Sequence, residues 1–307
     1  MNVQRIHRDS SDGQHARSES GKTSCPTRYR VSSGGHRMHT VPTGNFGKRL
    51  KRRIKWPLIS FVASLPDPVQ TMLFIPRIRK FGQRVPVLKV VYTGCYRTHP
   101  IDRALGTDTG GIEPPEAIYG DGIEAGSFPY MGAQPSVVRR ALQRLGDVRD
   151  HSFIDIGCGK GRPMIVATEF PFRQVIGYDL SVRLVNVANR NAQLVARQYP
   201  ERVPMRAFAA DALQLDFPPG KLVIYLFNPF GAPIMTRLLS QLAAAYERGT
   251  IEAFWIVYLH PLCEAVFDSS PLLERHYAGA EFYADEEIGY DAADRQELRI
   301  WKTKPRA

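Results

Sequence analysis

The sequence predicts an α/β fold, a three-layer sandwich in which helices cover both faces of a mostly parallel, doubly wound sheet. After Pro135, short apolar runs alternate with helical segments, and this βαβα order is typical of parallel strands joined by right-handed crossovers. Towards the C-terminus the alternation stops, and two strand-like runs follow each other without a long helix between them. Such a pair forms a hairpin, so we expect the sheet to end in antiparallel strands.

The regular part begins with an amphipathic helix, PSVVRRALQRLG, which runs from Pro135 to a stop at Gly146. Five strands are predicted at 152–156, 174–179, 204–210, 222–228 and 253–259. Helical patterns fill the intervals at about 160–170, 182–199, 233–247 and 261–268. The hairpin strands lie in AEFYADEE, from Ala280, and in ELRIWKT, from Glu297, which completes a seven-stranded sheet.

Composition divides the 307 residues into three regions. Residues 1–47 are rich in Ser, Gly, His and Arg and predict a disordered basic tail; a translation start at Met38 is an open alternative for the first 37 residues. Residues 48–134 predict an accessory helical layer and then a Gly/Pro/Asp-rich segment, long enough to be a lid. Residues 135–307 form the sheet domain.

The positive charge is concentrated near the N-terminus. The chain carries a net charge of +11, and residues 1–55 hold 13 Lys/Arg against 3 Asp/Glu, a net charge of +10. The basic block KRLKRRIK, residues 48–55, could contact phosphate or anionic lipid, although a solvated basic flank is the simpler interpretation. The remainder is nearly neutral, which does not favour a nucleic-acid partner for the sheet domain.

The four cysteines are scattered and form no C-x-x-C pair, so the sequence indicates neither a zinc site nor a disulfide framework, and we expect no metal. This usage fits a reducing cytoplasm. The apolar run WPLISFVASLP, residues 56–66, is too short to span a bilayer, so a soluble, cytoplasmic protein is expected.

The stretch FIDIGCGKGRP, residues 153–163, places three glycines at alternate positions directly after a predicted strand. In a doubly wound sheet the first turn from strand to helix lies against the ligand, and glycine lets the backbone approach it closely. A dinucleotide fingerprint that starts at Gly157 and Gly159 needs a third glycine at position 162, which is Arg162. The third glycine is instead Gly161, and Asp155 precedes the first glycine by two residues.

This pattern, apolar-apolar-Asp-apolar-Gly-x-Gly-x-Gly, resembles motif I of class I S-adenosylmethionine-dependent methyltransferases. The resemblance implies S-adenosyl-L-methionine as the cofactor, a Rossmann-like sheet, and a role for Asp155 in holding the methionine ammonium. A carboxylate suits that cation, whereas it would repel a pyrophosphate. The stretches LGTDTGG and YMGAQPSVVRRAL also resemble an uncharacterised bacterial branch of this family, and a turn without any ligand is the structural alternative.

The resemblance assigns further cofactor contacts to the ends of the next two strands. Asp179 stands where the family places a carboxylate for the ribose hydroxyls, and Leu180 follows it at the same site. Asp211 and Ala212 stand where the family contacts the adenine amino group. A helix cap is the alternative role for both aspartates, because Asp is common at helix N-termini.

The fourth strand ends in NPFG, in which Asn228 and Pro229 match part of an Asp/Asn-Pro-Pro-aromatic motif of amino-methylating members, while Phe230 replaces the second proline. The resemblance therefore suggests transfer to nitrogen, with Asn228 beside both cofactor and substrate. A simple turn after the strand is the alternative.

Other candidates lie at the fifth strand and in the lid. His260 could act as a general base because imidazole side chains commonly exchange protons in catalysis, although a lone histidine is more often structural. Tyr130 and Thr109 could close over the substrate. Lys160 and Arg162 could face an acidic group, but solvated positions on the first helix are expected, since charged side chains are rarely buried.

The sequence thus predicts a methyltransferase that acts on a nitrogen of a protein side chain or small molecule. An RNA methyltransferase, with residues 48–55 on the phosphates, is one alternative. A non-catalytic binding module that keeps only the architecture is another.

Overall fold

The computed structural model describes residues 58, 61–62, 64–85, 88, 91–94, 97–113, 130–291 and 293–305. The predicted tail, the basic block 48–55 and residues 114–129 of the predicted lid therefore lie outside the described residues. Within the described ranges no helix is long and apolar enough to cross a membrane.

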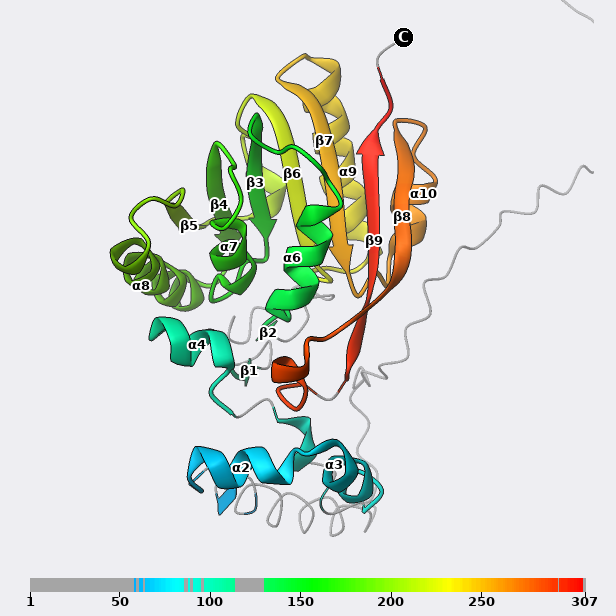
Figure 1. The fold of residues 1–307 in the computed structure, drawn as a ribbon. Coiled ribbons are helices and arrows are strands. Elements are labelled where there is room, and N and C mark those ends of the chain that lie inside the picture. The colour runs from blue at the N-terminus through cyan, green and yellow to red at the C-terminus, as the bar shows by residue number, and fades with distance from the viewer. Residues whose placement is uncertain are drawn as a thin grey trace, which may run out of the picture. The chain divides into compact units, whose positions relative to one another are not determined.

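A seven-stranded sheet forms the centre of the domain, with the strand order β5-β4-β3-β6-β7-β9-β8 (Figure 1). Neighbours from β5 to β7 pair in parallel, whereas β9 pairs antiparallel with both β7 and β8. The strands are β3 (His151–Ile156), β4 (Gln174–Asp179), β5 (Met205–Ala209), β6 (Gly220–Phe227), β7 (Ile251–Leu259), β8 (Leu273–Phe282) and β9 (Arg295–Thr303). The predicted fold class is confirmed.

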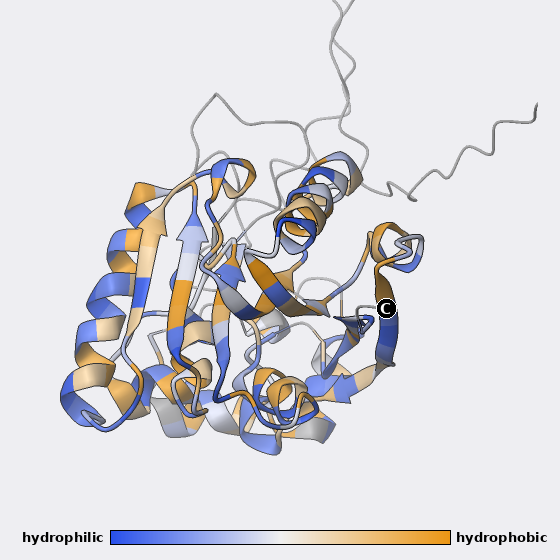
Figure 2. Cartoon of the chain, turned by 90° about the horizontal axis from the view of Figure 1, so that it is seen from above, coloured by the Kyte–Doolittle hydropathy of each residue, from blue (hydrophilic) through white to orange (hydrophobic). Residues whose placement is uncertain are grey.

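Helices cover both faces of this sheet. On one face lie α6 (Pro135–Gln143), α7 (Arg162–Ala167) and α8 (Val182–Gln198), and on the other lie α9 (Ala232–Glu247) and α10 (Glu264–Asp268) (Figure 1). Alternate residues of β3 separate the two cores: Phe153 faces the first group of helices, and Ile154 faces the second. Figure 2 shows the matching amphipathic pattern, with hydrophobic and hydrophilic residues alternating along the flanking helices.

The position of the penultimate strand differs from the prediction. The sequence placed a strand in residues 280–287, but β8 ends at Phe282, and Asp285–Glu287 form the short 3-10 helix η5. Most of β8 was missed, because the run LERHYAGAEF belongs to an edge strand and many of its side chains face solvent. An edge strand needs no continuous apolar run, so its sequence does not look like a core strand.

The region before the sheet consists of short elements: α2 (Asp67–Leu73), α3 (Pro76–Gly82), η2 (Val91–Thr93), α4 (Pro100–Leu105), and the two-residue strands β1 (Ile112–Glu113) and β2 (Tyr130–Met131), which pair with each other. The first helices share a small apolar core of Val62, Phe74, Val91 and Tyr92. Residues 105–111 run from the last residue of α4 to the start of β1, and we call this segment the 105–111 loop.

The strand order reverses beside β3. The chain runs from β3 outward through β4 to β5, then returns to the other side of β3 for β6. Crossovers that leave in opposite directions open a crevice at the carboxyl ends of these strands, where doubly wound sheets bind ligands. The turns after β3 and β6 therefore border the candidate site.

Candidate active site

The turn after β3 requires all three of its glycines. Gly157, Gly159 and Gly161 have φ angles of +77°, +53° and +83°, in the left-handed region that favours glycine. A Cβ atom at Gly157 would lie 2.8 Å from the Cβ of Pro229, and one at Gly159 would lie 2.3 Å from the ring of Tyr130. The turn is thus shaped by backbone geometry and by two close neighbours.

Asp155 provides a buried carboxylate beneath this turn. The residue is 1% exposed, and its Oδ2 has no hydrogen-bond partner among the described residues. Burial, and secondly the charge of Asp179, raise the pKa of Asp155 well above its ordinary value. A buried carboxylate without a partner is costly, so this arrangement fits a cationic group such as an ammonium.

Asp179 ends the neighbouring strand β4 and fastens the glycine turn to it. Its Oδ2 accepts a hydrogen bond from the backbone N–H of Gly159 at 2.9 Å, and its Oδ1 accepts one from the N–H of Ser181 at 2.8 Å. Burial raises the pKa of Asp179, and the two N–H groups oppose that shift. The next residue, Leu180, is half exposed, so an apolar side chain is available next to this carboxylate.

Asp211 caps the 3-10 helix η4 (Ala212–Gln214) after β5. Its carboxylate accepts hydrogen bonds from the backbone N–H of Leu213 at 2.9 Å and from the side chain of Gln214 at 3.2 Å. Ala212 is buried beside it. The capping role that the sequence left open is therefore present, and no described contact joins Asp211 to the glycine turn.

Asn228 directly follows β6 and is 5% exposed, with a φ angle of +43°. The hydroxyl of Tyr258, on β7, donates a hydrogen bond to Asn228 Oδ1 at 3.0 Å. Pro229 packs against Gly157, while Phe230 packs on the core formed with α9 and α10. The NPFG stretch thus touches the glycine turn, and the carboxamide of Asn228 is held in one orientation.

His260 directly follows β7, just as Asn228 directly follows β6. Phe227 pairs with Leu259 in the β6–β7 register, so Asn228 and His260 stand next in line at the same edge of the sheet. His260 has a φ angle of +51°, and in the described chain these two are the non-glycine residues with positive φ. Left-handed backbone at such residues is uncommon and clusters at functional sites. The imidazole of His260 is exposed.

The prediction for Lys160 and Arg162 was wrong. Both are buried, at 7% and 4% exposure, because the 105–111 loop covers them. Lys160 Nζ lies 3.0 Å from Asp108 Oδ1 and donates to the carbonyl of Gly110 at 3.0 Å. The Arg162 guanidinium donates to Thr109 Oγ1 and to the carbonyl of Thr109, both at 2.7 Å. Lys160, between the second and third glycines of motif I, and Arg162, directly after the third, therefore hold the 105–111 loop in place.

Two residues that the sequence did not single out complete this network. Asp102 Oδ1, on α4, accepts hydrogen bonds from the hydroxyls of Thr107 and Thr109 and from the N–H of Thr109, at 2.8, 2.7 and 3.0 Å. Asn191, on α8, pairs with the backbone N–H and carbonyl of Asp108, both at 2.9 Å. A polar residue on the apolar face of a predicted helix was the available signal for Asn191.

Tyr130 joins the 105–111 loop to the glycine turn. Its ring lies over Gly159, and its hydroxyl donates to the carbonyl of Thr109 at 2.8 Å. Burial raises the pKa of this hydroxyl, so it remains protonated and continues to donate. Tyr130 and Thr109 thus both lie at the site, on the side of the turn covered by the 105–111 loop.

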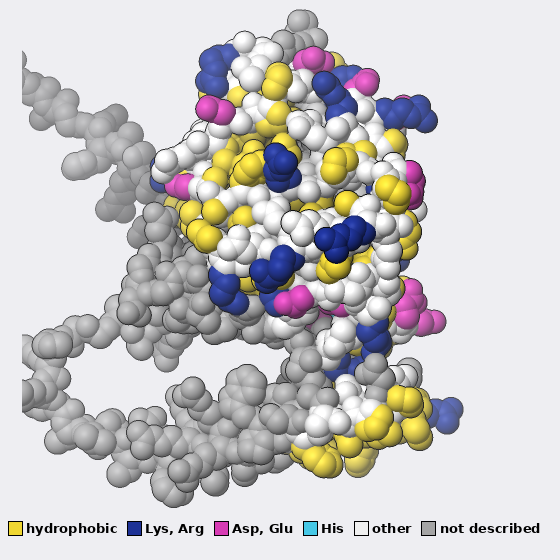
Figure 3. All heavy atoms as spheres, turned by 90° about the vertical axis from the view of Figure 1, so that its left-hand side faces the viewer, with side chains coloured by type: hydrophobic (Ala, Val, Ile, Leu, Met, Phe, Trp, Pro, Cys, Tyr) yellow, Lys and Arg dark blue, Asp and Glu magenta, His cyan; other side chains and the backbone are white. Residues whose placement is uncertain are grey.

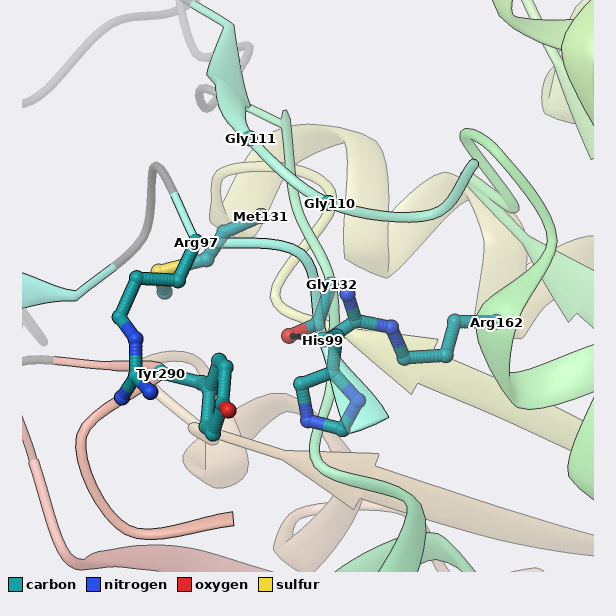
Figure 4. Close-up of a pocket in the computed structure, with 8 residues that line it drawn as sticks. All are labelled: Arg97, His99, Gly110, Gly111, Met131, Gly132, Arg162 and Tyr290. Atoms are coloured by element: carbon teal, nitrogen blue, oxygen red, sulfur yellow. Dashed lines mark hydrogen bonds between the residues drawn. The ribbon is translucent and has the colours of Figure 1, made fainter. Parts of the chain in front are cut away.

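A small cavity borders the outer side of this network. Figure 4 shows its lining, in which the Arg97 guanidinium lies over the Tyr290 ring at 4.2 Å, and Arg162 and His99 come from the other side. Burial and the charge of Arg162 lower the pKa of His99 to about 3, so this histidine is neutral and structural at pH 7. The cavity volume of about 10 Å³ is the size of one water molecule, too small for a methyl acceptor.

Comparison with known proteins decides the class of this domain. Residues 154–228 match the family description "Methyltransferase domain", and this stretch contains the glycine turn, Asp155, Asp179 and Asn228. The match coincides with the half of the sheet from β3 to β6 in which the strand order reverses. Residues 154–228 are therefore a methyltransferase domain. Together with motif I, this match supports S-adenosyl-L-methionine as the cofactor.

Solved structures share part of this fold at low identity. Magnesium protoporphyrin IX methyltransferase from Synechocystis PCC 6803, with bound SAM, is 13% identical over 55% of this chain and 77% of its own, with a TM-score of 0.39. YcgJ from Bacillus subtilis is 15% identical over 55% of this chain and 98% of its own, with a TM-score of 0.38. TrmN from Thermus thermophilus is 15% identical over 55% of this chain and 49% of its own, with a TM-score of 0.40. No curated protein matches the chain significantly.

Proposed function

We propose that this methyltransferase transfers its methyl group to a nitrogen atom of a protein side chain or of a small molecule. The observation that carries the proposal is the position of Asn228: its carboxamide is fixed by Tyr258 at the end of β6, next to the glycine turn. A fixed amide oxygen accepts N–H hydrogens and so orients a nitrogen lone pair. A carbon acceptor gains little from such a group, because C–H hydrogens are weak donors.

The cofactor contacts are part of the same proposal. Asp155 would hold the methionine ammonium, because its buried Oδ2 lacks a partner among the described residues. Gly157, Gly159 and Gly161 would let the backbone approach the amino-acid end. Asp179 would accept hydrogens from the ribose hydroxyls, with Leu180 against the base, and Asp211 and Ala212 would lie near the adenine amino group.

When bound, the cofactor supplies a methyl group that is already activated by a positively charged sulfur. The protein then has three tasks: to position the acceptor, to exclude water, and to accommodate the proton that the nitrogen loses. We assign positioning to Asn228 with the Pro229 and Phe230 backbone, and water exclusion to Tyr130 and Thr109. His260 is exposed at the same sheet edge and would take the proton.

A cytoplasmic location is also part of the proposal. It is supported by Cys158, which is a buried free thiol. Free thiols of this kind are typical of reducing compartments.

The test is a labelling experiment with methyl-labelled S-adenosylmethionine and a cell extract. Label that resists nuclease, and that is recovered as an N-methylated amino acid or small amine, would support the proposal. Label that is removed by ribonuclease would replace it with the RNA alternative, and an O-methyl product would contradict it.

Asn228→Ala should lower turnover by about 100-fold with little change in cofactor affinity, whereas Asn186→Ala, at an exposed asparagine of α8, should change neither.

A further inference from the structure

The accessory helices α2 and α3 expose an unusual set of apolar side chains. Of the eleven large hydrophobic residues exposed in the described chain, six lie between positions 61 and 81. Phe81, Phe61 and Met72 are 67%, 62% and 61% exposed. We call the following residues the α2–α3 patch: Phe61, Val69, Met72, Ile75, Ile78 and Phe81. Figure 3 shows a group of hydrophobic side chains at the bottom of the view, at the level of α2 in Figure 1.

This exposure is a property of a folded layer, because the opposite side of the same helices is packed. Phe74 lies on Tyr92 with 5.5 Å between the ring centroids, and Gly82 lies directly beneath the Tyr92 ring. Arg79, 7% exposed, donates to the carbonyls of Asp291 and Ala293 at 3.1 and 3.2 Å. The helices are thus anchored on one side, and their apolar residues are presented on the other.

The surroundings of the patch are basic. Arg77, Lys80 and Arg84 are exposed on or directly after α3. In the sequence, residues 48–84 contain ten Lys/Arg and a single acid, Asp67. The residues after this region are close to neutral in total, so most of the positive charge outside the N-terminal tail lies in the same stretch of sequence as the α2–α3 patch. The complementary partner is therefore both anionic and able to receive apolar groups.

We propose that the α2–α3 patch binds the surface of an anionic lipid membrane. Exposed Phe, Met and Ile side chains beside Lys and Arg are typical of segments that lie in the headgroup region, where apolar groups enter the acyl boundary and the cations remain at the phosphates. Nucleic acid offers the same phosphates, but Val69, Met72, Ile75 and Ile78 have no ring on which a base can stack. The partner that uses both properties of the patch is lipid.

The experiment is co-sedimentation of the full chain with vesicles. Binding is expected to phosphatidylcholine vesicles that contain phosphatidylglycerol, and not to phosphatidylcholine alone, and it should weaken with added salt because the contact is partly electrostatic. Phe81→Ser should weaken this binding by about tenfold. Phe282→Ser, at a residue 60% exposed on β8 and outside the patch, is the matched control and should leave vesicle binding unchanged.

Since both phenylalanines are exposed, neither variant should alter the melting temperature or the affinity for S-adenosylmethionine. A second variant, Arg77→Gln with Lys80→Gln, tests the charge separately and should reduce binding without any loss of apolar surface.

Equal effects of Phe81→Ser and Phe282→Ser, or no difference between the two kinds of vesicle, would overturn the proposal. Binding to an RNA oligonucleotide with no binding to vesicles, or a doubled mass that Phe81→Ser restores to that of the monomer, would identify a different partner and would equally overturn it.

Discussion

The end of β3 and the 105–111 loop lie against each other, yet their buried polar groups differ in whether they have hydrogen-bond partners. Around the loop, Asp102 of α4 accepts three hydrogen bonds, and Arg162 of α7 donates to Thr109 and to the carbonyls of Gly132 and Ala133. At the end of β3, a carboxylate oxygen of Asp155 has no partner among the described residues. Because an unpaired buried charge is destabilising, we infer that the loop network supports the structure and that Asp155 is kept for a ligand.

The largest effect on stability is expected for Arg162→Met. This substitution leaves the carboxylate of Asp102 buried without its cationic neighbour, 3.8 Å away, and removes the donors to the carbonyls of Thr109, Gly132 and Ala133. Breaking such a buried pair should lower the free energy of unfolding by about 3–5 kcal/mol, measured by denaturant titration.

Arg139→Met is the matched control. Arg139 also forms two hydrogen bonds to a carboxylate, Glu169, at 2.6 and 2.8 Å, but on the surface. A loss of at most about 1 kcal/mol is expected there. Equal losses in the two variants would show that the loop network is no more than a surface contact.

The next effect concerns Asp155→Asn, which should act in opposite directions on the empty and the bound enzyme. Without cofactor, replacing a buried carboxyl group whose Oδ2 has no hydrogen-bond partner among the described residues should raise the free energy of unfolding at pH 8 by about 1–2 kcal/mol. Affinity for S-adenosylmethionine should fall by about 30-fold or more, since a charge-assisted hydrogen bond is lost. Asp216→Asn, at an exposed aspartate, should change neither quantity. Calorimetry that finds normal affinity in Asp155→Asn would remove the assignment of the ammonium site.

Cofactor affinity should also depend on pH through Asp155. Its pKa is raised in the empty protein, so the neutral form is favoured there, whereas an ammonium group favours the carboxylate. Affinity should therefore fall by up to about tenfold for each pH unit below that raised pKa. For the empty protein the sign is reversed: the folded state binds the Asp155 proton more tightly than the unfolded state, so the contribution of Asp155 to stability is greatest at low pH and declines as pH rises from 3.8 through the raised pKa. Both slopes should be smaller in Asp155→Asn.

The smallest expected effect is the difference between alanine substitutions at Gly146 and Gly157, which distinguishes the cost of left-handed backbone from the cost of crowding at the turn. Gly146 and Gly157 have nearly equal φ angles, +75° and +77°, but a Cβ atom at Gly146 meets nothing within 4 Å, whereas one at Gly157 meets Pro229. Alanine at either position should cost about 1–2 kcal/mol from the left-handed backbone alone. Gly157→Ala should lower the melting temperature further and weaken cofactor binding, and Gly146→Ala should leave binding intact. Identical melting temperatures would mean that Pro229 moves aside freely.

The sequence predicted the parts of this molecule that follow from local patterns. The strand at 174–179 was placed at its observed bounds because a buried parallel strand reads as a bounded apolar run. The glycines were informative because their spacing distinguishes two kinds of turn, and all three have the left-handed backbone that only glycine adopts easily.

The parts that could not be predicted depend on contacts between distant segments. Lys160 and Arg162 have the composition of solvated residues, and nothing near them in the sequence shows that Asp108 and Thr109, more than 50 positions earlier, cover them. The first half of β8 was missed for a related reason, since its partner β9 follows it in the chain and its exposed side gives no apolar signal.

The place of β9 in the sheet has a consequence for how the protein is made. This strand is synthesised after β8 but lies between β7 and β8, and it pairs with β8 and with the edge of β7 that faces away from β6. While the ribosome is still translating residues 295–303, β8 has nothing to pair with and β7 presents an open edge. Since open edges invite pairing with other chains, the nascent protein is most exposed to misassembly during this last interval, and the enzyme can complete its sheet only after β9 has left the exit tunnel.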